Sequence, residues 1–493
     1  MTLAEMVTAA ADADDPMVVA LGDFDQGGVD PLGLRQLNFD LMDEVLPGLN
    51  NVAGQLKPFL LMAWAWRRVR IVVDRNGGTS SDEEVRDFVD RIEAIFAWSQ
   101  FLIDAASEIP GRQALAALLS SKTASFTFGG ASWVKRRSLR RSSTGLISPL
   151  NYGPGLRSMG WLLPVGPTGV FRPNPELELA LEAFETDMAE ELEHDAFNRL
   201  GAVEVSADEA RRWGKLWRLG EFREAERVAG WTRLAGTAAN PLRTRGLQYV
   251  KAVAHATKGE TDTSRIRALM AEPRIAAATG SDPQVALTWR RLQVRQLFRL
   301  SLEAWFHWLV GELLETMPKS SSAIADSFLD NAGVSFTDAK WLQINRRQNP
   351  VKLLERLASA LAGESDETVP SAVTAALRCC MFEARFEPMQ MRAPDRLPLR
   401  LAAENLNSWQ PSTALEGATR ILEKWILGQH AYWCVGRGLR DARGGGKQIL
   451  RLRVVMEEGG WTTPRGTRKG GAPLPTADRL ETALSLLREC GQF

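Results

Sequence analysis

The sequence predicts a mainly α-helical, multi-domain protein with a small α+β element near its C-terminal end. A chain of 493 residues is too long for one compact core, which indicates two or three domains. In several long segments apolar residues recur every three or four positions, as they do on one face of a helix. The alternation typical of a strand is confined to the C-terminal part of the chain.

The first domain is expected over residues 1–120. Its opening segment is rich in the Asp, Gly and Pro of turns, which predicts an irregular acidic lead-in. A short helix is expected over residues 37–45, and a second begins near Pro58. Ser81, followed three residues later by Glu84, makes a capping box that predicts the start of a third helix, which runs to about residue 106.

Residues 121–172 break the helical pattern and are expected to form a basic loop or a small irregular insertion. Gly, Pro and Ser are frequent in this segment. Long segments without regular structure are uncommon inside a compact domain, and those that occur are often functional or disordered. The segment is therefore the first place to look for functional residues.

One or more helical domains are expected over residues 173–440. They begin with an acidic helix over residues 175–200, and the longest helix is expected over 283–315, where apolar residues from Val294 to Leu313 form one stripe. Further helices are expected over 207–257, 350–362, 370–385 and 412–440.

Residues 441–493 are expected to form the small α+β element. The stretch "KQILRLRVVMEEGGW" alternates as a strand does, and a turn is expected at Glu458–Gly460. A final helix is expected over Ala477–Glu489. A strand or hairpin followed by a helix gives a small α+β unit on an otherwise helical protein.

The charge of the chain is balanced overall but unevenly distributed. Sixty acidic residues offset sixty Lys and Arg. Residues 122–160 carry seven bases and no acid, residues 176–210 carry twelve acids against one base, and residues 436–469 carry nine bases against three acids. Such segregation can produce a basic face that attracts polyanions, although it can also average out over solvated faces of the fold.

The stretch "ASWVKRRSLRRSSTG" is the strongest candidate for a binding site. Its basic side chains could neutralise phosphates while a base stacks on the tryptophan, as in single-strand binders. The alternative is a flexible surface loop with one anchoring aromatic residue. The candidate nucleic-acid-binding residues are Trp133, Lys135, Arg136, Arg137, Arg140 and Arg141 in this stretch, Arg291, Arg295 and Arg299 at a spacing of four in the longest helix, and Arg451 and Arg453 near the C-terminal strand.

Motifs that carry catalysis are not found. The stretch "RDARGGGKQ" lacks the first Gly and the Ser or Thr of a phosphate-binding loop, and no G-x-S-x-G motif is present. Two pairs of residues could hold a metal, Asp23 with Asp25 and Glu191 with His194. The alternatives are that Asp23 and Asp25 are turn residues and that Glu191 and His194 lie on a solvated helix face. We therefore predict no catalytic residue, no metal and no cofactor.

The sequence also predicts a cytoplasmic protein with no membrane contact. None of the four cysteines forms a C-x-x-C pair, which fits a reducing compartment. The first residues lack the basic and apolar regions of a secretory signal. The longest apolar runs are far shorter than the roughly 20 residues that a membrane span needs.

Residues 22–68 contain three motifs in a fixed order. D-P-L-G-L falls at Asp30–Leu34, L-P-G-L-N-N-V at Leu46–Val52, and an aromatic W-A-W stretch at Met62–Trp66. This block resembles the opening of uncharacterised bacterial proteins that are often encoded among phage-defence genes, and the closing stretch Pro475–Gly491 resembles their end. The resemblance implies a setting in antiviral defence and implies no catalytic residue.

The Pro and Gly residues of these motifs predict a structural role. Pro31 and Pro47 fix φ, and Gly33 and Gly48 permit turns, so that the aromatic helix enters its core at a set angle.

The function predicted from the sequence is that of a non-catalytic, nucleic-acid-contacting subunit or adaptor of a bacterial antiviral defence complex. Its partners would be DNA or RNA and other defence-system proteins that supply ATPase or nuclease activity. Two alternatives stay open. The first is a protein–protein scaffold whose basic loop docks on an acidic surface, and the second is a metal-dependent nuclease that uses Asp23 and Asp25 or the Glu191–His194 cluster.

Overall fold

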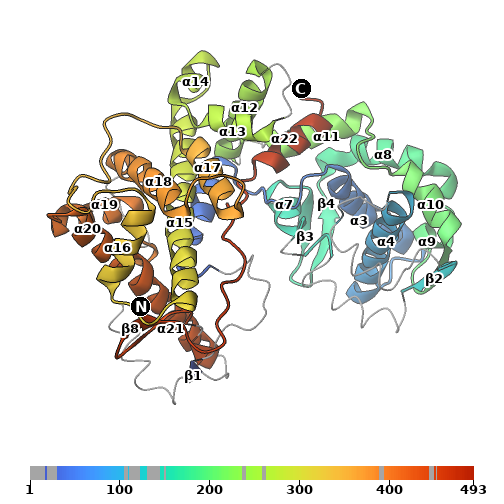
Figure 1. Cartoon of the computed structure of the whole chain (residues 1–493). Coiled ribbons are helices and arrows are strands. Elements are labelled where there is room, and N and C mark those ends of the chain that lie inside the picture. Colours follow the sequence, from blue (N-terminus) through green and yellow to red (C-terminus); the bar gives the residue numbers. More distant parts are fainter. Residues whose placement is uncertain are drawn as a thin grey trace. The chain divides into compact units, whose positions relative to one another are not determined.

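The protein is mainly α-helical with a few short strands, which confirms the predicted fold class (Figure 1). The computed structural model describes residues 17–18, 30–104, 109, 123–129, 145–148, 151–235, 240–257, 262–387, 394–443, 449–450 and 452–493. The chain divides into two compact units. Unit 1 holds the described parts of Met1–Met42 and Ser264–Thr476, and unit 2 holds those of Asp43–Thr263 and Ala477–Phe493.

The boundaries of these units differ from those of the four expected regions. The described residues before Asp43 belong with the C-terminal half of the chain, and the last helix belongs with the N-terminal half. Helix α2 (Gln36–Val45) and helix α13 (Thr263–Met270) each contain a boundary between the units.

The described residues of unit 2 form helices and two small pairs of strands. Its helices are α3 (Lys57–Arg75), α4 (Asp82–Ile103), α7 (Gly153–Ser158), α8 (Glu178–Asp187), α9 (Asp195–Asn198), α10 (Ala207–Leu216), α11 (Glu224–Ala235), α12 (Pro241–Ala256) and α22 (Leu480–Glu489), with 3-10 turns η2 (Pro175–Leu177) and η3 (Ala189–Glu191). Strand β2 (Ser125–Phe128) pairs antiparallel with β5 (Val203–Ser206), and β3 (Leu162–Val165) pairs antiparallel with β4 (Val170–Pro173).

The aromatic residues of α3 build the core of unit 2. The indole of Trp64 is fully buried, with ring centroids 5.4 Å from Phe184 of α8 and 6.4 Å from Trp217 after α10. The neighbouring helix α4 begins at the predicted capping box: Ser81 Oγ accepts from the backbone N–H of Glu84 at 3.2 Å, and the Glu84 carboxylate accepts from the N–H of Ser81 at 2.8 Å. The predicted start of α3 near Pro58 and the predicted start of α4 after Ser81 are both confirmed.

Two expectations for unit 2 are corrected. The acidic helix expected over residues 175–200 is broken into η2, α8, η3 and α9, because the His194 side chain caps a new helix by accepting from the N–H of Ala196 at 3.1 Å. The segment expected to be irregular over residues 121–172 contains β2, α7, β3 and β4 among its described residues.

Unit 1 is built around the long helix α15 (Pro283–Glu315), which has the predicted bounds. Its other elements are β1 (Met17–Val18), α14 (Pro273–Ala278), α16 (Ser321–Asn331), α17 (Pro350–Ala362), α18 (Val369–Glu383), η4 (Ala384–Phe386), η5 (Pro394–Arg396), α19 (Leu399–Trp409), α20 (Ala414–Ile421), the π-helical η6 (Leu422–Leu427), α21 (Gly428–Arg443), β6 (Ile449–Leu450), β7 (Val455–Glu457) and β8 (Gly460–Thr462). Strands β1 and β6 pair in parallel, and β7 and β8 form an antiparallel hairpin.

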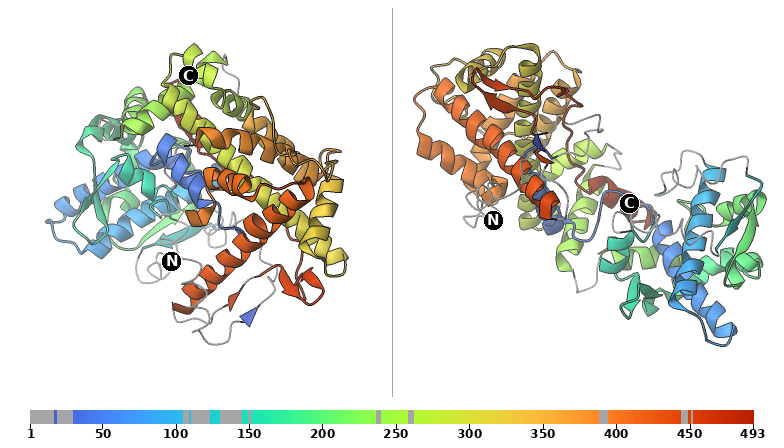
Figure 2. Two further views of the ribbon diagram at one scale, coloured as in Figure 1. Left: turned by 90° about the vertical axis from the view of Figure 1, so that its left-hand side faces the viewer. Right: turned by 90° about the horizontal axis from the view of Figure 1, so that it is seen from below.

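Helix α15 lies against α17 and α18 and supplies the centre of the unit 1 core (Figures 1 and 2). Trp305 is fully buried and stacks on Phe328 of α16 with ring centroids 3.7 Å apart. The predicted turn at Glu458–Gly460 is confirmed by the β7–β8 hairpin, while α22 belongs to unit 2. The C-terminal strands and helix are thus present but lie in different units.

The D-P-L-G-L motif is a structural connector in unit 1, as predicted. The Asp30 carboxylate accepts from the backbone N–H groups of Leu34 at 2.9 Å and of Arg35 at 3.1 Å, which closes the turn. Leu32 and Leu34 are fully buried in the unit 1 core. Gly33 has φ +69°, a conformation that disfavours any residue with a Cβ.

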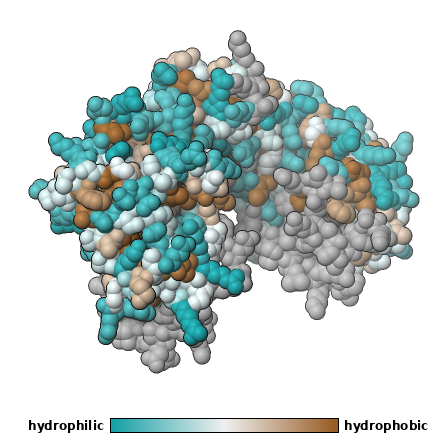
Figure 3. All heavy atoms as spheres, viewed as in Figure 1, coloured by the Kyte–Doolittle hydropathy of each residue, from teal (hydrophilic) through white to brown (hydrophobic). Residues whose placement is uncertain are grey.

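The surface carries hydrophobic residues in scattered places among hydrophilic ones on the face shown in Figure 3. Among the exposed large hydrophobic residues are Leu287, Leu314, Phe336 and Phe386 in unit 1. Within the described parts of the chain, no helix combines the length and the apolar character that a membrane crossing requires.

Candidate functional site

The predicted basic site lies outside the described residues. This holds for Trp133, Lys135, Arg136, Arg137, Arg140 and Arg141, and also for Arg451 and the alternative metal residues Asp23 and Asp25. The segment that contains the basic run is bounded by described residues on both sides, Gly129 after β2 and Gly145 before α7.

Both ends of this segment are attached to the core of unit 2. On one side the buried Phe128 ring lies 5.9 Å from Trp98 of α4. On the other side the side-chain amide of Asn151 donates to the carbonyl of Gly145 at 2.8 Å, and Leu146 is buried. The residues that lead into and out of the basic run therefore hold set positions on unit 2.

Arg295 and Arg299 are not on the surface, so the interpretation of their stripe as an extension of a basic face is wrong. The Arg295 side chain is 1% exposed, and its guanidinium donates to the carbonyls of Leu397 at 2.6 Å and Arg396 at 2.7 Å. Burial lowers the pKa of Arg295 to about 10. Arg299 is fully buried and pairs with Glu303, one turn along the same helix, at 2.5 Å.

Arg453 is also buried, and its guanidinium donates to the carbonyls of Arg468 and Lys469. Burial lowers its pKa. Each of these three arginines donates to backbone carbonyls, those of Leu397 and Arg396 for Arg295, Leu474 for Arg299, and Arg468 and Lys469 for Arg453, which is a structural role. Of the four described candidates, Arg291 alone is partly exposed and faces a pocket.

Glu191 and His194 make hydrogen bonds to other residues of unit 2. The Glu191 carboxylate accepts from Arg212 at 2.6 Å and from the indole N–H of Trp213 at 2.9 Å, and these hydrogen bonds, led by that of Arg212, lower its pKa. His194 caps α9 and lies 3.2 Å from Glu209. No cluster of three or more His, Cys, Asp or Glu with metal-binding geometry occurs in the described residues.

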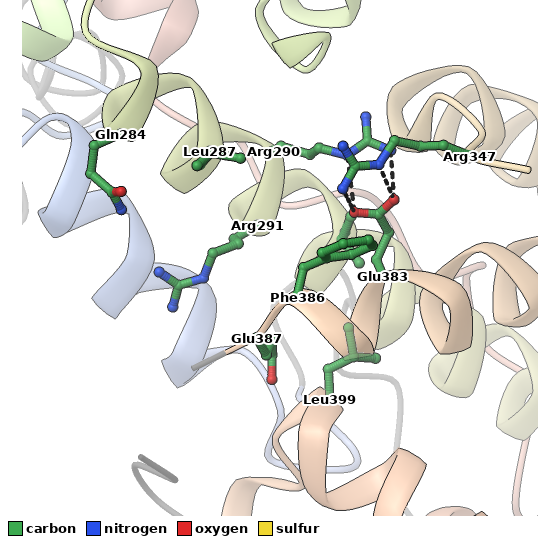
Figure 4. Close-up of a pocket in the computed structure, with 10 residues that line it drawn as sticks. Gln284, Leu287, Arg290, Arg291, Arg347, Glu383, Phe386, Glu387 and Leu399 are labelled. Carbon is green, nitrogen blue, oxygen red and sulfur yellow. Dashed lines mark hydrogen bonds and ion pairs between the residues drawn. The ribbon is translucent and has the colours of Figure 1, made fainter. Parts of the chain in front are cut away.

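The clearest candidate site in the described residues is a pocket of about 280 Å³ in unit 1, here called the Arg347 pocket (Figure 4). Helix α15 supplies one wall at helical spacing with Gln284, Leu287, Arg290, Arg291 and Val294. The facing wall comes from the end of α18, η4 and the start of α19 with Glu383, Phe386, Glu387 and Leu399, and Arg347 completes the rim.

One carboxylate in the lining of the Arg347 pocket lies between two guanidinium groups. Glu383 accepts from Arg290 at 2.9 and 3.1 Å and from Arg347 at 2.9 and 3.2 Å, so each of its oxygens receives two hydrogen bonds. Arg290 is buried and also donates to the carbonyls of Ala271 and Gln348, both at 2.7 Å. Two positive charges share one negative charge, which leaves this part of the lining cationic.

Arg347 differs from Arg290 because its guanidinium reaches the open side of the pocket. Its side chain is 34% exposed, and the guanidinium lies over the Phe386 ring at 4.6 Å. Figure 4 shows both arginines converging on Glu383, with Phe386 beside them and Leu399 on another side of the hollow. Within the described residues, Nη1 of Arg347 makes no hydrogen bond to the protein. A ligand could use this edge.

Sequence reasoning missed this site. The spacing of Arg291 with Arg295 and Arg299 predicts a shared basic face, but the pocket lining combines Arg291 with Arg347 and Glu383 from distant segments. The apolar spacing of Leu287 and Val294 on the same helix face was the one available signal.

Comparisons of the chain with protein-family models, curated proteins and solved structures give no match.

Proposed function

We propose that this protein is a non-catalytic subunit or adaptor of a bacterial antiviral defence complex that acts in the cytoplasm and contacts DNA or RNA through residues 133–141. Partner proteins would supply ATPase or nuclease activity. The observation that carries the proposal is the run of five basic side chains beside Trp133, with no acidic residue between positions 122 and 160.

The chemistry of this run suits a nucleic-acid backbone. Lys and Arg that neutralise phosphates release condensed counterions, and an adjacent indole offers a stacking surface for a base. Phe128 and Leu146, close to either end of the run, are buried in unit 2.

Three of the described histidines make hydrogen bonds within the fold, and the proposed binding role uses none of them. His194 caps α9, and His255 lies 3.1 Å from the carbonyl of Gln492. His430 lies between the carbonyl of Pro31 and the N–H of Arg453. Burial lowers the pKa of His307 to about 4, with Lys469 and Arg453 adding to the shift.

The test is fluorescence anisotropy with labelled single- and double-stranded DNA and RNA, titrated with salt. We expect wild-type binding with a log–log salt slope of about 4 if all five bases contact phosphates. A variant with Lys135, Arg136, Arg137, Arg140 and Arg141 changed to Ser should lose most of this slope.

A matched control removes the same charge elsewhere on unit 2. Arg70, Arg75, Arg172, Lys215 and Arg218 are exposed and, like the basic run, comprise one lysine and four arginines. Changing these five to Ser should leave the salt slope within about one unit of the wild type. If both variants lose the same amount of salt slope, binding depends on the net charge of the protein and not on residues 135–141.

The remaining outcomes separate the rival functions. If the wild type binds no nucleic acid but copurifies with neighbouring gene products through the basic run, the protein is a scaffold. If Mg²⁺ or Mn²⁺ supports cleavage that Asp25→Ala abolishes, it is a nuclease. Copurification with an ATPase or nuclease, together with the salt-sensitive binding, would support the proposed subunit.

A further inference from the structure

The Arg347 pocket in unit 1 is built from residues that the proposed function does not use. All of its lining residues lie between positions 284 and 399, within one unit. The lining has a charged part, made of arginine and glutamate side chains, and an apolar part. The class of ligand can be inferred from these two parts.

The charged part of the lining favours an anion. Three arginines face two glutamates, which leaves one net positive charge. Both glutamates are already engaged: Glu383 accepts four hydrogen bonds from the two arginines, and Glu387 accepts from the backbone N–H of Arg400 at 2.9 Å. The carboxylates are therefore poorly placed to attract a cation.

Arg347 is the group best placed to contact the anion. Its Nε and Nη2 are held by Glu383, which fixes the plane of the guanidinium, and its Nη1 edge points away from that pair. A guanidinium with a fixed plane presents its remaining N–H groups in a geometry that matches carboxylate and phosphate oxygens. The Phe386 ring covers one face of this guanidinium and shields that face from water.

The rest of the lining is apolar and partly uncovered. Phe386 is 57% exposed and Leu287 is 39% exposed, which are high values for large hydrophobic side chains beside a hollow. Val294 and Leu399 are buried and lie deeper in the wall. A ligand with an apolar body would remove the exposed surfaces of Phe386 and Leu287 from water, which is favourable.

The size of the pocket limits the ligand. Ligand pockets commonly hold about 300–1,000 Å³, so a pocket of about 280 Å³ takes a small molecule. We propose that the Arg347 pocket binds a small organic anion, with a carboxylate or phosphate group at Arg347 and a flat apolar body between Phe386 and Leu287. This activity is independent of the basic run at residues 133–141.

Two pairs of probes test the proposal by isothermal titration calorimetry with the full chain. Indole-3-acetate carries a carboxylate and AMP carries a phosphate, and their neutral counterparts are indole-3-acetamide and adenosine. We expect at least one anion to bind with a Kd of about 1 mM or tighter, and its neutral counterpart to bind at least about tenfold more weakly. The pair that responds identifies the carboxylate or the phosphate as the preferred group.

A charge placed on the rim supplies the decisive variant. Leu287→Glu sets a negative charge beside the anion and should weaken binding by about tenfold or more. Leu314→Glu is its matched control, because Leu314 lies on the same helix, is also 39% exposed and does not line the pocket. Leu314→Glu should bind as the wild type does.

A second pair of variants tests the apolar contact without changing charge. Phe386→Ala should weaken binding by about three- to tenfold because the stacking surface is lost. Phe336→Ala, at a residue that is 39% exposed and outside the pocket, should have no effect. The melting temperatures of all four variants establish that the fold is intact.

Three results would overturn the proposal. They are the absence of binding by both anionic probes, equal binding of the charged and neutral probes, and equal affinities in Leu287→Glu and Leu314→Glu. The variant with residues 135–141 stripped of charge should retain full affinity for the anion. If it instead loses the binding of AMP while unit 1 is unchanged, the phosphate is bound by the basic run and the pocket is not the site.

Discussion

Replacing Gly33 by Ala tests the role of the D-P-L-G-L turn, because two separate costs can be assigned to the added Cβ. The residue has φ +69°, where an L-amino acid with a Cβ costs about 1–2 kcal/mol. The added Cβ would also lie 2.5 Å from Cδ2 and 2.7 Å from Cε3 of Trp433. Carbon atoms pack at about 3.5–4.0 Å, so the indole or the turn must move by about 1 Å.

Trp433 is held where this movement would be needed. The Arg396 guanidinium lies over its ring at 4.1 Å and also donates to the carbonyl of Gly33 at 2.9 Å. Overpacking of this kind costs about 1–3 kcal/mol. The total expected loss of unfolding free energy for Gly33→Ala is therefore about 2–5 kcal/mol.

The control is Gly363→Ala, in the same unit. Gly363 follows α17 at φ +72° and its added Cβ would meet nothing within 4 Å, so it carries the backbone cost alone. Urea unfolding followed by tryptophan fluorescence should place Gly33→Ala about 1–3 kcal/mol below Gly363→Ala. In the Trp433→Leu background this difference should shrink. Equal losses for the two glycine variants would refute the steric argument, and an unchanged difference in the Trp433→Leu background would show that the indole is not its source.

Three further predictions concern buried titratable groups. Burial lowers the pKa of His430 to about 4, so the unfolded chain binds a proton below about pH 6.5 that the folded chain does not. Between pH 6.5 and 4 this group should lower the unfolding free energy by about 3 kcal/mol, and urea titrations of His430→Gln should lack that contribution. Burial raises the pKa of Glu489 to about 7, so the chain takes up a proton on folding between about pH 4.5 and 7. The unfolding free energy therefore falls as pH rises through that window. At pH 8 Glu489→Gln should unfold at a higher urea concentration than the wild type, and at pH 4 the two proteins should unfold at the same urea concentration. Glu383→Gln leaves Arg290 buried without its full charge partner and should cost about 3–5 kcal/mol in urea unfolding, whereas Glu404→Gln, in an exposed i,i+4 pair, should cost less than about 1 kcal/mol.

The helices could be predicted from the sequence because their signals are local. The capping box at Ser81, the proline at position 283 and the apolar spacing that follows each lie within a few residues of the helix they specify, and the structure begins α4 and α15 at those places. The acidic helix over residues 175–200 was mispredicted because composition does not reveal where a side chain caps a new helix, as His194 does.

The unit boundaries and the Arg347 pocket depend on contacts between distant residues, which one sequence does not display. Arg290 and Glu383 are 93 positions apart, and Arg347 and Glu383 are 36 apart. The pairing of a guanidinium with a carboxylate carries no local pattern, since any of many acids in the chain could be the partner. The same limit applies to the last helix, whose amphipathic pattern identifies a helix but not the unit that it joins.

The misassigned arginines explain how a basic stripe in a sequence can be interior. A spacing of four puts Arg295 and Arg299 on one helix face, and solvated surfaces and buried networks satisfy that spacing equally well. The structure uses both side chains to donate to carbonyls of segments far along the chain, Leu397 for Arg295 and Leu474 for Arg299. Because a buried guanidinium cannot reach a phosphate without unfolding its surroundings, Arg295→Met should change the urea midpoint of unit 1 and leave the salt slope of nucleic-acid binding unchanged. If Arg295→Met changes the salt slope of nucleic-acid binding but leaves the urea midpoint unchanged, Arg295 is a nucleic-acid-binding residue and the argument from burial is wrong.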